Sequence, residues 1–199
     1  MKILCIADLH LCDKEALSII KDIDYDVLIL LGDNPVDALQ YIKKMNGNRR
    51  MFGVSGNHDE WETLDRNGIE NIHGKVVTVN GVTFAGMGGS HRYKEGNYAM
   101  LTHEESIEIA KHLFSAEVVI SHDCPYRVFS NNTAHKGLKG LSYYIRKHKP
   151  KVNLCGHYHF AKRKKYRRTV CQCVFGIQLF EYQKGKLYEE NFCDKEQAL

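Results

Sequence analysis

The sequence contains no apolar run that approaches the roughly 18 residues needed for a membrane-spanning helix. Its first ten residues, MKILCIADLH, carry one lysine and then only five apolar residues before the first aspartate. That stretch is too short for the apolar core of a signal peptide and is typical of a buried β-strand. We therefore expect no membrane partner and a cytoplasmic protein.

Cysteine pairs of the CxxC type are also absent, and the seven cysteines are an odd number. The odd number excludes a disulfide framework that uses every cysteine. Cys5 and Cys155 lie within apolar runs, where cysteine behaves as a small core residue. These features indicate free thiols in a reducing cytoplasm.

The sequence has no large excess of either charge: 28 basic and 24 acidic residues leave a net charge of only +4. This balance does not by itself indicate a nucleic-acid partner. However, six basic residues fall within 162–168, KRKKYRR. The run would either attract RNA or DNA or form a solvated strand edge whose lysines oppose aggregation. Tyr166 is its sole aromatic residue, which favours the strand edge.

Linkers, internal repeats and low-complexity segments are missing, so we expect a single domain over residues 1–199. Apolar runs of strand length alternate with amphipathic segments, and the alternation predicts an α/β fold whose sheet is covered on both faces. The predicted strands are 2–7, 25–33, 50–59, 116–123 and 150–157, with a hairpin at 75–89 and two or three antiparallel strands after 168. The predicted helices are 14–22, 36–45, 103–114 and 137–149.

Side chains that bind metals follow every one of the predicted buried strands. The carboxyl ends of strands in α/β sheets are the usual ligand sites, and carboxylate, imidazole and amide oxygen are all metal ligands. The seven candidates are Asp8, His10, Asp33, Asn57, His122, His157 and His159. Seven ligands are too many for one tetrahedral ion but suit two ions that share a bridging carboxylate.

The spacing of the histidines supports this interpretation. In an extended chain, residues i and i+2 point to the same side, so Asp8 can converge with His10, and His157 with His159. Nitrogen and oxygen ligands accept manganese, iron, zinc, nickel or cobalt as two divalent ions. We expect manganese to support activity in vitro.

The order of these motifs resembles the calcineurin-like metallophosphoesterase family, over residues 2 to about 160. The matching stretches are Asp8-x-His10, Gly32-Asp33, Gly56-Asn57-His58-Asp59, His122 and Gly156-His157-x-His159. The resemblance implies a four-layer α/β/β/α sandwich of two mixed β-sheets with flanking helices. It also implies that the strands after 168 complete the second sheet.

The same resemblance assigns roles to the matching positions. Asp8, His10 and His159 are expected to hold one ion, and Asn57, His122 and His157 the other. Asp33 is expected to bridge the two ions. A hydroxide between the ions would attack the phosphorus atom, His58 would donate a proton to the leaving oxygen, and Asp59 would orient His58.

The expected activity is hydrolysis of a phosphate ester, with a phosphodiester slightly preferred over a monoester because the Asn-His-Asp set resembles members with that activity. One alternative is a nuclease that uses segment 162–168 to bind RNA or DNA, and a nucleotide or nucleic acid stays open as a partner. A non-catalytic protein-binding scaffold is disfavoured, because every ligand and His58 are present. The sequence does not set the oligomeric state.

Candidates for substrate binding lie in two loops. His91 and Arg92, followed by Tyr93, occur in the loop 88–93, and His135 occurs in 131–140. Ordinary connecting loops are the alternative in both places. The remaining histidines are expected to be structural or solvated, and they are His73, His103, His112 and His148.

Overall fold

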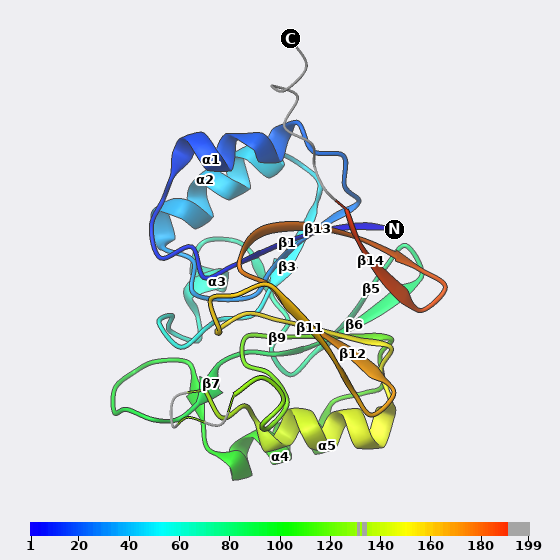
Figure 1. Ribbon diagram of the computed structural model, residues 1–199. Coiled ribbons are helices and arrows are strands. Elements are labelled where there is room, and N and C mark those ends of the chain that lie inside the picture. Colours follow the sequence, from blue (N-terminus) through cyan, green and yellow to red (C-terminus); the bar gives the residue numbers. More distant parts are fainter. Residues whose placement is uncertain (131, 133–134, 191–199) are drawn as a thin grey trace.

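The computed structural model describes residues 1–130, 132 and 135–190. Two six-stranded mixed sheets face each other and helices cover their outer sides (Figure 1). The predicted four-layer α/β/β/α sandwich is therefore confirmed. Within the described residues, no helix has both the length and the apolar character needed to cross a membrane.

The first sheet has the strand order β14-β13-β1-β2-β3-β4. The bounds are β1 Lys2–Ala7, β2 Val27–Leu30, β3 Arg50–Gly53, β4 Glu70–Asn71, β13 Gly176–Gln183 and β14 Lys186–Glu190. Strands β1 to β4 run parallel, and β13 pairs antiparallel with β1 and with β14.

The second sheet has the order β11-β12-β10-β9-β6-β5. Its bounds are β5 Val76–Val79, β6 Val82–Met87, β9 Val118–Ser121, β10 Val152–Cys155, β11 Lys162–Tyr166 and β12 Thr169–Cys173. Strands β6, β9, β10 and β12 are parallel, and β5 and β11 form antiparallel edges. A separate pair joins β7 Ser90–His91 to β8 Met100–Leu101.

The helices α1 Lys14–Ser18 and α2 Val36–Asn46, with the 3-10 turn η1 Ile19–Lys21, cover the first sheet. Helices α4 His103–His112 and α5 Lys139–His148 cover the second. The predicted helices are thus present; α2 extends one residue beyond its predicted end, and the others are shorter than predicted. Short elements such as α3 Thr63–Arg66 escaped prediction, because four residues are too few to establish a period.

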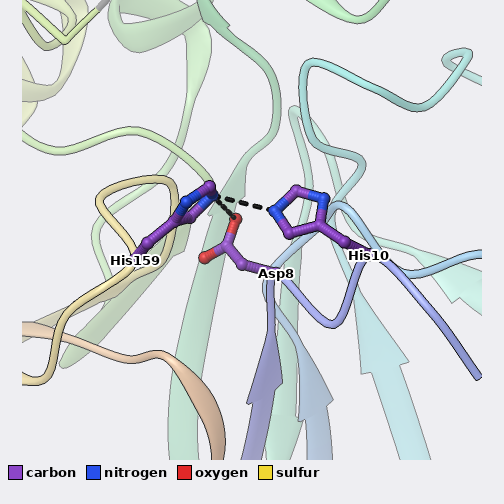
Figure 2. Close-up of side chains that lie close together, drawn as sticks. All are labelled: Asp8, His10 and His159. Atoms are coloured by element: carbon purple, nitrogen blue, oxygen red, sulfur yellow. Dashed lines mark hydrogen bonds and ion pairs between the residues drawn. The ribbon is translucent and has the colours of Figure 1, made fainter. Parts of the chain in front are cut away.

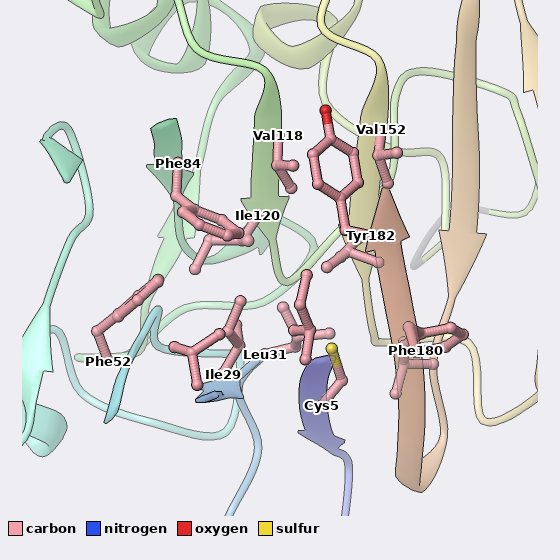
Figure 3. Packing of buried hydrophobic residues seen from close by; sticks show 14 of the residues in the cluster. Cys5, Ile29, Leu31, Phe52, Phe84, Val118, Ile120, Val152, Phe180 and Tyr182 are labelled. Atoms are coloured by element: carbon pink, nitrogen blue, oxygen red, sulfur yellow. The ribbon is translucent and has the colours of Figure 1, made fainter. Parts of the chain in front are cut away.

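The core between the sheets comes mainly from one face of the central strands, among them β1, β2, β9 and β10 (Figure 3). In β1, Cys5 faces the opposite sheet, whereas Leu4 and Ile6 pack against α1 and α2. The rings of Phe52 and Phe84, one from each sheet, meet edge to face at 5.4 Å between centroids. Burial on both faces explains why these strands are continuous apolar runs rather than alternating ones.

The expectation that the strands after 168 complete the second sheet is wrong for β13 and β14. They join the first sheet, where Phe180 pairs with Ile3 of β1, and only β12 enters the second sheet. Strand β12 also runs parallel to β10. Phe180 and Leu179 point to opposite faces and are both buried, so β13 can serve as a covered strand beside β1.

The six cysteines among the described residues are all free thiols, as the sequence indicates. Cys5 and Cys155 are fully buried. Cys193 lies outside the described residues.

Candidate metal centre

The candidate ligands gather where parallel strands of both sheets end. Loops after β1, β2 and β3 come from the first sheet, and loops after β9 and β10 come from the second. Two clusters of metal-ligand side chains form there, each with its ligand atoms within 4.8 Å of one another. The clusters are Asp8, His10 and His159, and Asp33, His122 and His157. Each cluster combines side chains from both sheets, so the centre depends on how the sheets pack together.

In the first cluster, two ring nitrogens and one carboxylate oxygen converge (Figure 2). His10 Nε2 and His159 Nε2 are 2.8 Å apart, and Asp8 Oδ1 is 3.9 Å from His159 Nε2. Asp8 Oδ1 is buried and accepts no hydrogen bond from the described residues, whereas Oδ2 accepts one from the His157 backbone N–H at 2.7 Å. Both histidines are exposed, so this cluster opens to solvent and leaves room for a ligand.

In the second cluster, the fully buried His122 has a fixed orientation. Its Nδ1 lies 2.7 Å from the carbonyl oxygen of Leu31, and only a protonated Nδ1 can donate to that oxygen. The other nitrogen, Nε2, then faces Asn57 Oδ1 at 2.8 Å and Asp33 Oδ2 at 3.3 Å. Three electron-pair donors that face one another require a cation or a proton between them. The donor set therefore fits a divalent metal, with Asn57 as a further ligand.

The carboxylates of the centre are strongly perturbed by burial and by each other. Burial raises the pKa of Asp8 to about 6. Burial also acts to raise the pKa of Asp33, but the neighbouring His122 outweighs it and holds the pKa of Asp33 below its ordinary value. Asp33 in turn raises the pKa of His122 against the effect of burial. Without a metal, the pair therefore keeps a proton that a bound cation would displace.

The backbone of the ligand loops is unusual. Five of the seven candidate ligands have a positive φ, with values of 56° at Asp8, 57° at His10, 55° at Asp33, 74° at His157 and 51° at His159. Such conformations are costly for residues other than glycine and concentrate at functional sites. The extended-chain explanation of the i, i+2 spacing is therefore wrong. The chain bends at each ligand, and His157 and His159 enter different clusters.

Two glycines allow the loops after β2 and β3 to touch. Gly32 has a φ of +93°, and a Cβ there would lie 2.6 Å from Gly56 Cα and from His122 Nδ1. The close approach lets the backbone N–H of His58 donate to Asp33 Oδ1 at 2.8 Å. Glycine at these two positions therefore couples the position of Asp33 to that of His58.

Asp59 contacts the backbone of both ligand loops. Its Oδ2 accepts hydrogen bonds from the backbone N–H groups of Gly56 at 2.7 Å and Asp33 at 2.9 Å, and no described hydrogen bond joins it to the His58 ring. Asp59 is half-buried, whereas His58 is exposed. Asp59 therefore braces the two ligand loops, and its expected role in orienting His58 stays a prediction.

His58 lies between the two clusters of ligand side chains and a cavity. Its ring centroid lies 5.6 Å from that of His10. On its other side, His58 lines a cavity of about 310 Å³ together with Asn34, Val36 and Asn67. A group bound at the clusters would thus have space beyond His58 for a second substituent.

The predicted substrate residues fall into two sets. The ring centroid of His135 lies 4.7 Å from that of His157, at the second cluster. In contrast, the His91 ring stacks on His103 at 4.2 Å, and Arg92 binds Glu105 at 3.2 Å. The described side-chain contacts of His91 and Arg92 therefore lead toward α4, whereas the His91 backbone N–H donates to Asp123 Oδ2 at 3.1 Å, next to the candidate ligand His122.

Two aromatic residues at the centre carry no metal-binding signal in the sequence. Phe175 is 44% exposed and its ring stacks on His159, with centroids 5.6 Å apart. The Tyr93 hydroxyl accepts a hydrogen bond from Asn57 Nδ2 at 3.0 Å. Both come from loops outside the motifs, so only the fold reveals their positions.

The contact of Tyr93 leads to a prediction about metal affinity. Its hydroxyl holds the Asn57 amide so that Oδ1 faces His122. In Tyr93→Phe, we expect metal affinity to fall by about tenfold, with little change in kcat at saturating metal, because partners that orient ligands tune metal binding. Activity titrated with Mn²⁺ measures this. Tyr98→Phe in the same loop is the control, and equal metal affinities in the two variants would contradict the role of Tyr93.

The profile of the calcineurin-like phosphoesterase superfamily domain matches residues 1–175. The chain therefore belongs to this family of phosphoesterases, as its motifs suggest. Among curated proteins, it is 28% identical over 177 residues to the uncharacterized protein MJ1162 of Methanocaldococcus jannaschii, with 80% of each chain covered.

Solved structures support the fold. The protein TT1561 of Thermus thermophilus superposes with a TM-score of 0.68 at 16% identity, over 96% of this chain and 98% of that one. A structure described as a novel archaeal phosphodiesterase gives a TM-score of 0.55 at 16% identity, over 96% and 99% of the two chains.

Proposed function

We propose that this protein is a metal-dependent phosphodiesterase with two divalent ions. The observation that carries the proposal is the pair of ligand clusters, Asp8, His10 and His159 beside Asp33, His122 and His157. Asp33 acts electrostatically on both Asp8 and His10 of the other cluster, which supports a bridging position between the ions. Two ions there would neutralise a phosphate group and lower the pKa of a water molecule between them.

The residues of this chain would divide the remaining work. His58, exposed beside the clusters, would donate a proton to the leaving oxygen. His135 would contact the phosphate near the second ion. The cavity beyond His58 would accept a second ester substituent, which favours a diester over a monoester. The archaeal phosphodiesterase of similar fold is compatible with this preference.

The two other candidate functions receive less support. A nuclease would need the cations of segment 162–168 at the metal centre. This segment starts three residues after His159 but runs away along β11, so that Arg167 and Arg168 lie at the opposite end of the sheet from His157. A scaffold without catalysis would not need a complete ligand set and an accessible His58.

The free thiols among the described residues support a reducing cytoplasm.

A substrate panel tests the proposed function. We expect Mn²⁺-dependent hydrolysis of bis(4-nitrophenyl) phosphate to exceed that of 4-nitrophenyl phosphate by roughly tenfold in kcat/KM, and a chelator to abolish both. Cyclic nucleotides and oligonucleotides complete the panel, with Ni²⁺, Zn²⁺, Co²⁺ and Fe²⁺ as alternative ions. If none of these esters is hydrolysed with any of the ions, the enzyme proposal fails. Preferential cleavage of oligonucleotides would support the nuclease instead.

A further inference from the structure

Segment 162–168 divides into two parts in the structure. In strand β11, Arg163 donates to Gln172 Oε1 at 2.8 Å and to the Leu187 carbonyl, and Lys164 donates to the Val128 carbonyl at 2.8 Å. These two charges therefore help to hold the sheet edge. Arg167 and Arg168, in contrast, form the two-residue turn between β11 and β12, where Tyr166 pairs with Thr169.

The turn lies beside the C-terminal end of α5 (Figure 1). Residues of both line a cavity of about 470 Å³. Four cationic side chains line it, together with the buried residues Ile145 and Thr169. The cations are Arg146, Lys149, Arg167 and Arg168. None of them makes a side-chain hydrogen bond or ion pair with any residue that the structure describes, although Arg146 and Arg167 lie over tyrosine rings. Like charges gathered without an acidic partner repel each other unless an anion joins them.

Backbone conformation adds an independent observation. Lys149 ends α5 with a φ of 54°, and Arg167 has a φ of 57° in the β-turn. Glycine or asparagine normally occupies both kinds of position, because a side chain is strained there. The partial negative charge at the C-terminus of α5 explains why Arg146 and Lys149 occur there. It does not account for the two arginines contributed by the hairpin.

We propose that this cavity binds an anion with two or more linked phosphate groups, either free or as part of a nucleotide. Guanidinium groups form paired hydrogen bonds with phosphate oxygens, and three of the four cations are arginines. The cavity has the volume of a small-molecule site. An extended nucleic-acid strand is disfavoured, because Arg163 and Lys164 of the adjoining strand are already bound to protein acceptors.

The site is separate from the metal centre. The turn that lines the cavity lies next to Lys151, just before the N-terminal end of β10. His157 of the metal centre follows the C-terminal end of the same strand. The four residues of β10 that lie between them span about 13 Å. The proposal therefore does not depend on the proposed phosphodiesterase activity, and either can fail alone.

Binding of tripolyphosphate to metal-free protein in EDTA, measured by calorimetry in about 100 mM NaCl to screen weak surface attraction, tests the site. We expect saturable binding with a dissociation constant below roughly 100 μM. The variant Arg167→Ala with Arg168→Ala should bind at least about tenfold more weakly. Lys162→Ala with Lys165→Ala removes the same charge from exposed positions of β11 and should change affinity by less than about twofold. ATP competes with tripolyphosphate if the site takes nucleotides, and only free polyphosphate binds if it does not.

The metal-loaded arginine variant should hydrolyse an aryl phosphate diester as wild type does, within about twofold. Absence of saturable binding by wild type at tripolyphosphate concentrations up to about 1 mM would overturn the proposal. Equal weakening in both double variants would also overturn it, because general charge attraction would then suffice. Tighter binding of a single-stranded oligonucleotide than of tripolyphosphate, weakened in both variants, would indicate a nucleic-acid surface instead.

Discussion

The Asp33→Asn variant is expected to lose stable binding of both metal ions and to lower kcat/KM by roughly 10³-fold or more. Asp33 Oδ2 faces His122 in the second cluster, and its carboxylate also acts on Asp8 and His10 of the first. Asparagine has the same shape but lacks the negative charge that would compensate two cations. One substitution should therefore empty two sites.

The metal content of desalted protein, measured by elemental analysis beside the wild type, checks this prediction. Asp37→Asn is the matched control, because Asp37 lies four residues away, is exposed, and accepts only the backbone N–H of Ala38 among the described residues. It should retain both ions. Circular dichroism would establish that Asp33→Asn folds. A folded variant that keeps wild-type stoichiometry would rule out a bridging role for Asp33.

The sequence alone predicts the strand ends because each buried apolar run is followed directly by a polar residue that can bind a metal. Buried strands such as β2, with four fully buried residues, are recognisable as continuous apolar runs. The polar residue that follows each run must then lie at the carboxyl edge of the sheet. Asp8 and His10 both follow β1, so their position at this edge of the sheet could be predicted from that strand alone.

The backbone at the ligands could not be predicted by the same reasoning. Asp33 and His157 adopt positive φ because the packing of neighbouring loops overrides local preference. Gly32 shows the cause, since it permits a contact with Gly56 that a side chain would block. A period-2 pattern contains no information about such bends, so the partition of His157 and His159 between clusters required either the structure or the family resemblance.

Residues that support the ligands were harder still to predict. Asp59 accepts two backbone N–H groups, and Tyr93 accepts the Asn57 amide from 36 residues away. Both contacts depend on tertiary structure between loops, which have no periodicity. The family resemblance implied that Asp59 orients His58, which stays a prediction, and gave no sign of these two backbone contacts.

The sheet assignment of the tail failed for a related reason. Strand β13 is buried on both faces at Phe180 and Leu179, so its pattern fits either sheet equally well. Pairing with β1 is determined by the free edge that β1 presents after β2 has taken its other side. Which strand has a free edge depends on the whole fold, so it cannot be predicted from the sequence of one strand at a time.

The His58→Gln variant is expected to retain both metal ions and to lose about 10²- to 10⁴-fold in kcat for a diester with a poor leaving group. His58 is exposed beside His10 and lines the adjoining cavity, but belongs to neither ligand cluster. Glutamine keeps hydrogen-bonding capacity without the ability to donate a proton as an acid. The loss should therefore be larger for an alkoxide leaving group than for 4-nitrophenolate, which departs without protonation.

Rates for a series of aryl and alkyl diesters, combined with elemental analysis, separate this role from simple structural damage. His112→Gln serves as the control, because His112 is a largely exposed histidine on α4. Loss of metal in His58→Gln would assign His58 to metal binding. An equal loss of rate for good and poor leaving groups would instead place His58 in binding of the phosphate, since only proton donation depends on the basicity of the departing oxygen.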